Sequence, residues 1–253
     1  MMRRAAERLT RGMRFRRRLP PAFGSNPIWV SPSAGLGYLF KAMDKLDPVL
    51  LGLAREFVKE KSVVWDIGAN VGLFSFGAAH LAGKDGQVLA VEADAGLVGL
   101  LRRSAAIQAA ASAPVRVVPA AVAGSVDLRT FHIAARSRSA SFLHGYGSTQ
   151  AGGTAEEQTV VAVTLDWLAD RCPLPDVLKI DVEGAELEVL KGAGTLMDRK
   201  RPVLLCEVSD TNAAEIAALL RERRYRIFDG EVSGSLRKEL HSAPWCTVAI
   251  PDP

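Results

Sequence analysis

Strand and helix patterns alternate along most of the chain, and this alternation limits the folds that it can adopt. Short apolar runs typical of buried strands are followed by segments with the 3.6-residue period of helices. The expected strands are 63–66, 87–92, 115–120, 158–165, 176–182, 203–208, 225–229 and 244–251, and the expected helices are 73–82, 95–109, 165–171, 185–192 and 212–223. Such alternation predicts an α/β fold with a mostly parallel sheet covered by helices on both faces.

The chain divides into three parts by composition. Residues 1–20 form a basic arm that is expected to be flexible, residues 21–60 an N-terminal helical extension, and residues 61–253 the α/β domain. Within the extension, Asp47 followed by Pro48 is a helix start signal, since an acid at the cap and proline at the first helical position are both favoured. A chain of 253 residues, 48% of them apolar, suits one such domain with small additions.

The positive charge is concentrated in the arm. Residues 1–18 hold eight arginines and one acid, a net charge of +7, which leaves −3 of the total +4 for the rest of the chain. The body is therefore not expected to bind nucleic acid specifically. The arm itself is typical of a solvated tail, although it could also contact an anionic membrane surface or an acidic carrier, and its arginine content resembles that of mitochondrial presequences.

The rest of the composition points to a protein of a reducing compartment, and we expect it to be cytoplasmic. Cys172, Cys206 and Cys246 are odd in number and lack C-x-x-C spacing, so they predict neither a disulfide framework nor a zinc site. The sequence has no uninterrupted run of about 18 apolar residues, so we do not expect a transmembrane helix.

The segment "VVWDIGANVGLFS" (63–75) places glycines and one acid between a strand and a helix. Gly68 and Gly72 permit a tight turn and close approach of a ligand to the backbone, with Asn70 between them. A pyrophosphate-binding loop would need G-x-G-x-x-G, and Asp66 would repel a pyrophosphate but attract a sulfonium. The turn therefore favours a cationic nucleoside ligand, the alternative being a tight turn that is only rich in glycine.

A second acid stands at the end of the next expected strand. Glu92 lies twenty residues after Gly72, at the separation where a carboxylate accepts hydrogen bonds from both ribose hydroxyls. Dinucleotide and S-adenosylmethionine sites share this feature, and an exposed acid at a strand end is the alternative.

Further acids follow the later strands. Asp181 ends the strand 176–182, Glu183 and Glu186 flank the turn into the next helix, and Glu207 ends the strand 203–208. Because ligands bind at the carboxyl ends of parallel strands, we expect Asp181 to face the reaction crevice. Helix capping is the alternative role for Asp181 and Glu183.

Five segments together resemble the FkbM family of S-adenosylmethionine-dependent methyltransferases over residues 60–250. They are "VVWDIGANVGLFS", "VLAVEAD", "VTLDWL", "DVLKIDVEGAELEVLKGA" and "RPVLLCEV", and they occur in this order. The resemblance implies a Rossmann-like class I methyltransferase with a seven-stranded sheet whose last strand is antiparallel. It also implies methylation of a hydroxyl oxygen on a sugar, polyketide or related natural product, so a small molecule or glycan would be the acceptor.

By the same resemblance, S-adenosyl-L-methionine would be held by Asp66, Gly68, Asn70, Gly72 and Glu92, and Asp181 and Glu183 would line the acceptor crevice. The chain departs from the family pattern at Asp94, where proline is common, and at Ser104 and Gln108, where asparagines are usual.

Methylation of a hydroxyl also requires a group that removes its proton. Asp181, Glu207 and His144 are the candidate bases. His144 lies in a polar segment that could close over the acceptor, the alternative being an exposed loop histidine. The spacing of Asp181 and Glu207 shows no tight cluster of oxygen ligands, so no metal is expected.

Three other functions compete with this interpretation. A nicotinamide-dependent dehydrogenase is disfavoured by Asp66 and by the missing G-x-G-x-x-G motif. A module that binds S-adenosylmethionine or a partner without catalysis is disfavoured by the intact Asp66, Glu92 and Asp181. A nucleic-acid methyltransferase is disfavoured by the mildly acidic body and the absence of an N-P-P-Y-type motif.

Overall fold

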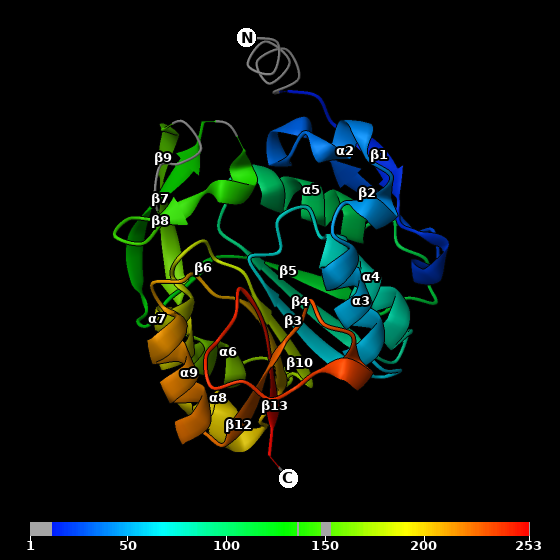
Figure 1. Cartoon of the computed structure of the whole chain (residues 1–253). Coiled ribbons are helices and arrows are strands. Elements are labelled where there is room, and N and C mark those ends of the chain that lie inside the picture. Colours follow the sequence, from blue (N-terminus) through cyan, green and yellow to red (C-terminus); the bar gives the residue numbers. More distant parts are fainter. Residues whose placement is uncertain (1–11, 136, 148–152, 253) are drawn as a thin grey trace.

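The computed structural model describes residues 12–135, 137–147 and 153–252, and its centre is a seven-stranded sheet (Figure 1). The strands are β3 (Val63–Ile67), β4 (Gln87–Glu92), β5 (Val115–Pro119), β10 (Val177–Ile180), β11 (Val203–Glu207), β12 (Tyr225–Asp229) and β13 (Cys246–Pro251). Their order in the sheet is β12-β13-β11-β10-β3-β4-β5.

The last strand, β13, is antiparallel to both of its neighbours, β11 and β12, as expected from the sequence. The pairs β10–β11, β10–β3, β3–β4 and β4–β5 are parallel. A dinucleotide-binding doubly wound sheet ends in three parallel strands in chain order. Here β13 lies between β11 and β12 instead, so the sheet differs from that arrangement at this edge.

Helices cover both faces of the sheet. They are α3 (Pro48–Phe57), α4 (Leu73–Ala82) and α5 (Ala95–Ala105) on one face, and α6 (Leu165–Ala169), α7 (Glu186–Lys191), α8 (Gly194–Arg199) and α9 (Ala213–Glu222) on the other. Successive side chains of a strand point to opposite faces. Val64 accordingly packs in the core under α3–α5, and Trp65 in the core under α6–α9.

A second, four-stranded sheet stands beside the carboxyl ends of the parallel strands. It has the order β6-β9-β7-β8, and its strands are β6 (Ala121–Val122), β7 (Asp127–Ala134), β8 (Phe142–Leu143) and β9 (Thr154–Val163). The sequence predicted only the second half of β9. β7 was missed because its first half is largely exposed, so apolar residues do not mark it out, and Phe131 and Ile133 become buried only in its second half.

The N-terminal region is not wholly helical. Phe15–Arg18 form strand β1, which pairs antiparallel with β2 (Pro27–Val30), and α2 (Gly37–Phe40) follows. The expected flexible arm 1–20 is therefore ordered from β1 onward, while residues 1–11 lie outside the described part. Arg17 donates hydrogen bonds to the carbonyl oxygens of Tyr38 and Lys41, so a basic residue of the arm holds the segment after α2.

Helix α3 begins where the sequence predicted, at Asp47 and Pro48. The side chain of Asp47 accepts a hydrogen bond from the backbone N–H of Leu50 at 2.9 Å, and Pro48 is the first helical residue. Before it, the expected helical extension forms only two short elements, α2 and a single 3-10 turn at Met43–Lys45.

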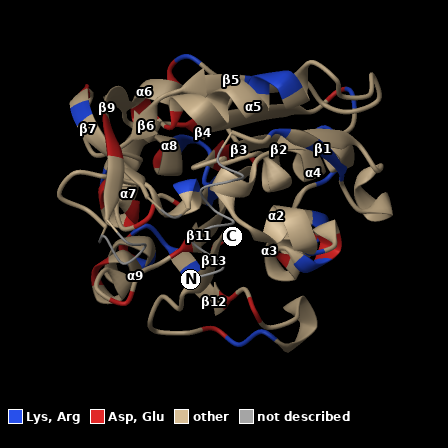
Figure 2. Cartoon of the chain, turned by 90° about the horizontal axis from the view of Figure 1, so that it is seen from above, with Lys and Arg blue, Asp and Glu red and all other residues tan. Residues whose placement is uncertain are grey.

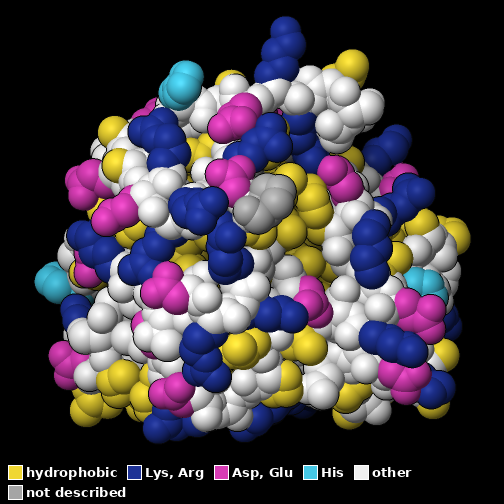
Figure 3. Space-filling view, turned by 90° about the horizontal axis from the view of Figure 1, so that it is seen from below, with side chains coloured by type: hydrophobic (Ala, Val, Ile, Leu, Met, Phe, Trp, Pro, Cys, Tyr) yellow, Lys and Arg dark blue, Asp and Glu magenta, His cyan; other side chains and the backbone are white. Residues whose placement is uncertain are grey.

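Charged side chains are distributed unevenly over the ends of the molecule. Seen from above, β1 and the last turn of α5 carry blue Lys and Arg residues and lie on the same side of the molecule (Figure 2). There the guanidinium carbons of Arg16 and Arg103 lie 5.8 and 5.9 Å from the centroid of Trp29. From below, basic and acidic side chains are interspersed (Figure 3). No helix in the described residues is long and apolar enough to cross a membrane.

Because β1 belongs to the fold, two truncations should differ. Deleting residues 1–18 removes the β1–β2 pairing, the packing of Phe15 and both Arg17 hydrogen bonds, whereas deleting residues 1–11 removes none of them. We expect the longer deletion to have the lower Tm in calorimetry, by at least about 2–4 °C, the shift that about 1 kcal/mol causes in a domain of this size. Equal Tm values would show that β1 adds nothing to stability.

Candidate active site

The turn between β3 and α4 depends on left-handed backbone at three positions. Gly68, Asn70 and Gly72 have φ of 76°, 52° and 89°. A Cβ on Gly68 would lie 1.8 Å from the carbonyl oxygen of Asp181, so only glycine allows the ends of β3 and β10 to come this close. A Cβ on Gly72 would instead meet the ring of Phe76 at 2.5 Å. Gly72 is thus required by packing behind the turn.

Glu92 joins this turn to the end of β4. It is only 6% exposed, and its two carboxylate oxygens accept hydrogen bonds from the backbone N–H groups of Asn70 (2.7 Å) and Asp94 (2.8 Å). Burial raises the pKa of Glu92 to about 7, although both N–H groups act in the opposite direction. Each oxygen keeps a further lone pair for a donor in the adjoining cavity.

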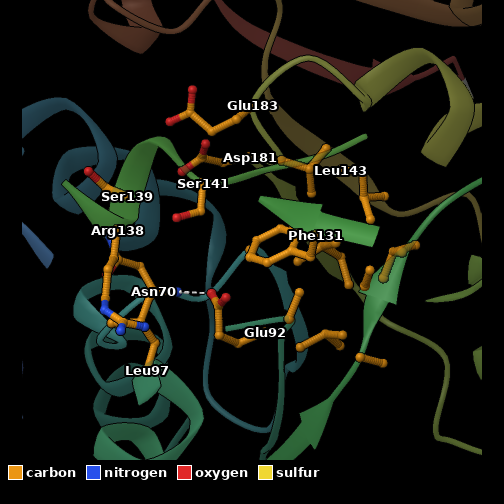
Figure 4. A pocket seen from close by; sticks show the side chains of 18 residues that line it. Asn70, Glu92, Leu97, Phe131, Arg138, Ser139, Ser141, Leu143, Asp181 and Glu183 are labelled. Atoms are coloured by element: carbon orange, nitrogen blue, oxygen red, sulfur yellow. Dashed lines mark hydrogen bonds between the residues drawn. The ribbon is translucent and has the colours of Figure 1, made fainter. Parts of the chain in front are cut away.

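A cavity opens in front of Glu92, at the carboxyl ends of β3, β4 and β10 (Figure 4). The space inside it, including the open solvent at its mouth, is about 570 Å³. We name it the donor cavity, and its lining residues are Ile67, Gly68, Asn70, Val91, Glu92, Ala93, Leu97, Ala120, Ala121, Val122, Phe131, Arg138, Ser139, Ser141, Leu143, Asp181, Val182 and Glu183. Its walls combine apolar side chains with polar ones, among them the Glu92 carboxylate and the buried Asn70 Oδ1, which has no hydrogen-bond partner.

An ion pair borders this cavity on the side of α5. Asp94 accepts hydrogen bonds from the N–H groups of Gly96 and Leu97 and so caps α5. Arg138 Nη1 lies 2.5 and 2.6 Å from the two carboxylate oxygens of Asp94, and its side chain runs along the cavity wall in Figure 4. An acid at position 94 therefore both starts α5 and fixes a residue of the β7–β8 connection.

A buried lysine, Lys179, connects the acids behind the cavity. Its Nζ lies 3.1 Å from Asp66 Oδ1 and 3.3 Å from Asp181 Oδ2, and it donates to the carbonyl oxygen of Gly68 at 2.8 Å. Burial alone would lower the pKa of Lys179, but the charges of Asp66 and Asp181 outweigh it and raise that pKa. The sequence analysis missed Lys179, although residues two apart on a strand point to the same side, which already places Lys179 beside Asp181.

Asp66 does not face the donor cavity. It is fully buried, its Oδ2 accepts a 2.5 Å hydrogen bond from the Ser75 hydroxyl, and its other oxygen pairs with Lys179. Asp66 is therefore not placed to attract a sulfonium directly, although the sequence predicted such an attraction. Asp66 acts on the site through Lys179.

The donor cavity meets a second, larger cavity at two acids. Asp181 and Glu183 line both of them. We name the second one the acceptor cavity. The space inside it, including the open solvent at its wide mouth, is about 1690 Å³. Its lining residues are Ala140, Phe142, Gly145, Tyr146, Gly147, Asp181, Glu183, Gly184, Glu186, Glu207, Ser209, Asp210, Thr211, Asn212 and Trp245.

The pKa values of two acids in this cavity are displaced upward. Burial and then the charge of Asp181 raise the pKa of Glu183 to about 7 and that of Glu207 to about 8. Glu183 also has φ of 55°, a strained conformation for a residue other than glycine that is common at functional sites. Such displaced acids in a cleft are typical of a reaction site.

His144 is not among the residues that line either cavity. Its Nδ1 lies 2.9 Å from Nε2 of His132, whose Nδ1 is 3.4 Å from a carboxylate oxygen of Glu157. These contacts join residues of the small sheet, and His144 stays an untested prediction as a base. Among the described residues, no group of three or more His, Cys, Asp or Glu side chains could hold a metal ion.

The buried charges make a stability prediction. Replacing Lys179 by Met leaves Asp66 charged and buried without its counter-ion, which should lower the free energy of unfolding by about 3–5 kcal/mol in chemical denaturation. Lys191→Met is the matched control, because Lys191 is half exposed and its pair with Glu188 should contribute at most about 1 kcal/mol. Adding Asp66→Asn to Lys179→Met should recover part of the loss. Equal stability of the two single variants would contradict a structural role for Lys179.

Comparisons with known proteins agree with a methyltransferase. A family model described as the methyltransferase FkbM domain matches residues 66–227. Hexuronic acid methyltransferase AglP of Haloferax volcanii is 25% identical over 177 residues, 69% of this chain and 68% of that protein.

Two solved structures are similar at lower identity. Methyltransferase FkbM from Methylobacillus flagellatus KT is 17% identical, with a TM-score of 0.45 over 75% of this chain and 43% of that chain, so this chain spans less than half of its length. Fibrillarin of Aeropyrum pernix, solved with natively bound S-adenosyl-L-methionine, is 10% identical, with a TM-score of 0.47 over 80% of this chain and 73% of that chain. Because the family model matches well over half of the residues, including the turn after β3, Glu92 and Asp181, the chain belongs to the FkbM methyltransferase family, and its cofactor is S-adenosyl-L-methionine.

Proposed function

We propose that this chain transfers the methyl group of S-adenosylmethionine to a hydroxyl oxygen of a sugar, polyketide or related natural product. The observation that carries the proposal is the meeting of the donor and acceptor cavities at Asp181 and Glu183. A carboxylate there lies between the two reactants, where a proton must be removed. The similarity to a hexuronic acid methyltransferase supports a sugar-like acceptor.

The polar groups of the donor cavity fit the cofactor. Glu92 is held by two backbone N–H groups and can accept hydrogen bonds from the ribose hydroxyls, and the unpartnered Asn70 Oδ1 can accept another. Gly68 permits close approach to the turn, while Asp66 and Gly72 support it from behind. The apolar residues Leu97, Val122 and Phe131 offer walls for the base.

The chemistry needs alignment and one proton acceptor. The bound cofactor supplies an electrophilic methyl on a sulfonium, and its transfer to a hydroxyl gives a methyl ether, S-adenosylhomocysteine and a proton. Asp181 is our candidate base, because it lines both cavities and Lys179 fixes its carboxylate. Glu207 is the second candidate, at the end of the neighbouring strand β11.

Two rival functions have less support. The G-x-G-x-x-G motif of a nicotinamide enzyme is absent, and the family match is to a methyltransferase. A module that binds without catalysis would have no need for acids at the junction of two cavities.

The role of Glu92 can be tested by binding. Glu92→Gln keeps one oxygen acceptor and the shape but removes the charge, so binding of S-adenosylmethionine should weaken by about 1.5–3 kcal/mol, or roughly 10- to 150-fold. Calorimetric titration measures it, and Glu188→Gln is the control, because Glu188 is a partly exposed residue of helix α7 that lines neither cavity. Unchanged affinity in Glu92→Gln would remove Glu92 from the ribose, and tight NAD binding by the unaltered protein would overturn the methyltransferase assignment.

The base can be tested by turnover and its pH dependence. Asp181→Asn should lower turnover by about 10²–10⁴-fold, with little change in cofactor affinity. Because the pKa of Glu207 is about 8, a mechanism with Glu207 as base would gain rate as the pH rises through 8, when its carboxylate form appears. We expect Glu207→Gln to keep most of the turnover at saturating acceptor. Loss of activity in Glu207→Gln, together with loss of a rise near pH 8, would assign the base to Glu207 instead.

A further inference from the structure

The acceptor cavity has a strongly one-sided charge. Five acids line it, Asp181, Glu183, Glu186, Glu207 and Asp210, and no Lys, Arg or His is found among its described lining residues. Lys179 partly balances Asp181 from behind the sheet end. The other four carboxyl groups have no ion-pair partner within this lining, so the cavity favours positive charge.

The raised pKa values of these acids agree with a cavity that favours positive charge. The pKa values of Glu183, Glu186 and Glu207 are all raised, by burial first and by the charge of neighbouring acids. Glu186 is 2% exposed, and its Oε2 is buried without a hydrogen-bond partner. A cation that entered would relieve this repulsion, whereas an anion would add to it.

An exposed aromatic side chain stands beside the acids. Trp245 lines the cavity and is 55% exposed, which is unusual for so large a side chain. Its carbonyl oxygen accepts the backbone N–H of Val208 at 2.8 Å, and the next residue, Cys246, pairs in register with Glu207. Trp245 and Glu207 are therefore held together by the β11–β13 pairing. An indole and carboxylates that line one cavity can together bind an ammonium group.

We propose that the acceptor of this enzyme is a cationic polyol, such as an amino sugar, whose ammonium group binds at Trp245, Glu207 and Asp210. This inference rests on the proposed function and adds the charge of the substrate to it. It also separates this chain from its relative that methylates a hexuronic acid. A uronate carboxylate would enter a cavity lined by five acids and no described base.

Three methyl glycosides of similar shape test the proposal: those of glucosamine, glucose and glucuronic acid. Each is titrated by calorimetry into the full chain loaded with S-adenosylhomocysteine. We expect the amine to bind at least about 10-fold more tightly than the neutral sugar, the acid to bind most weakly, and the advantage of the amine to fall as salt is raised. Equal affinities, no measurable binding of the amine, or tighter binding of the acid would overturn the proposal.

A pair of variants locates the binding site. Trp245→Leu should reduce the affinity for the amine by about 3- to 30-fold, with S-adenosylhomocysteine affinity unchanged. Phe40→Leu is the control, since Phe40 is an exposed aromatic residue outside both cavities. An equal effect of the two substitutions on amine binding would overturn the assignment to Trp245.

The product separates this inference from the proposed function. Mass spectrometry with fragmentation shows which atom of a bound sugar gains the methyl group. Methylation of the nitrogen of the bound amine would overturn O-methylation and leave the cationic acceptor standing. Binding of the amine without any transfer, or faster O-methylation of the neutral or acidic sugar, would overturn the cationic acceptor.

Discussion

The buried ammonium of Lys179 holds the reaction end of the sheet together. It joins Asp66 on β3 to Asp181 after β10 and also binds the carbonyl oxygen of Gly68 between them. Gly68 permits this closeness, because any side chain there would collide with the Asp181 backbone. Three charges and one carbonyl thus fix the position of two strand ends, and the donor cavity lies directly in front of them. Since a buried pair that loses one member leaves an uncompensated charge, the arrangement depends on all of its members.

The departures from the family pattern have a structural use in this chain. Ser104 accepts a hydrogen bond from the backbone N–H of Trp29, and Gln108 donates to the carbonyl oxygen of Pro27, so both side chains fasten β2 to α5. Asp94 caps the same helix and pairs with Arg138. At each of these positions, α5 makes contacts with segments outside the parallel sheet. The N-terminal hairpin and the β7–β8 connection are therefore attached to the cofactor side of the domain through one helix.

The sequence predicted most of the central sheet because its patterns are local. Strand β4 and helix α4 have the predicted bounds, since both are apolar runs, Gly86 precedes β4, and Gly72 and Gly83 flank α4. The small sheet could not be predicted in the same way, because β7 is stabilised by its pairing with the distant β9 and has few buried residues of its own in its first half. Strand β1 (Phe15–Arg18) was not predicted from the sequence for a similar reason. Their arginines suggest a solvated tail, and only pairing with β2 makes them a strand.

In the candidate site, too, the sequence predicted the local features but not the contacts between separate elements. The turn after β3, Glu92 and Asp181 could be found from spacing, because each follows a strand whose end must face the crevice. The sequence could not show that Asp66 points to Lys179 or that His144 pairs with His132, since these contacts depend on how separate elements pack. The position of Trp245 beside Glu207 depends on the antiparallel insertion of β13 next to β11.

Charge is handled differently in the two cavities. In the donor cavity, Glu92 is satisfied by backbone N–H groups, and Asp66 behind it is balanced by Lys179. The residues there need little from a ligand beyond shape and hydrogen bonds. In the acceptor cavity, Glu183, Glu186 and Glu207 have raised pKa values and no basic partner in the lining, so these acids are better stabilised when a cation is bound. With the cationic acceptor that we propose, the carboxylates at the junction of the two cavities would lie between a sulfonium and an ammonium and would lower the repulsion between them. Asp181, our candidate base, belongs to the same group, so the acids at the ends of β10 and β11 would serve both charge compensation and proton removal.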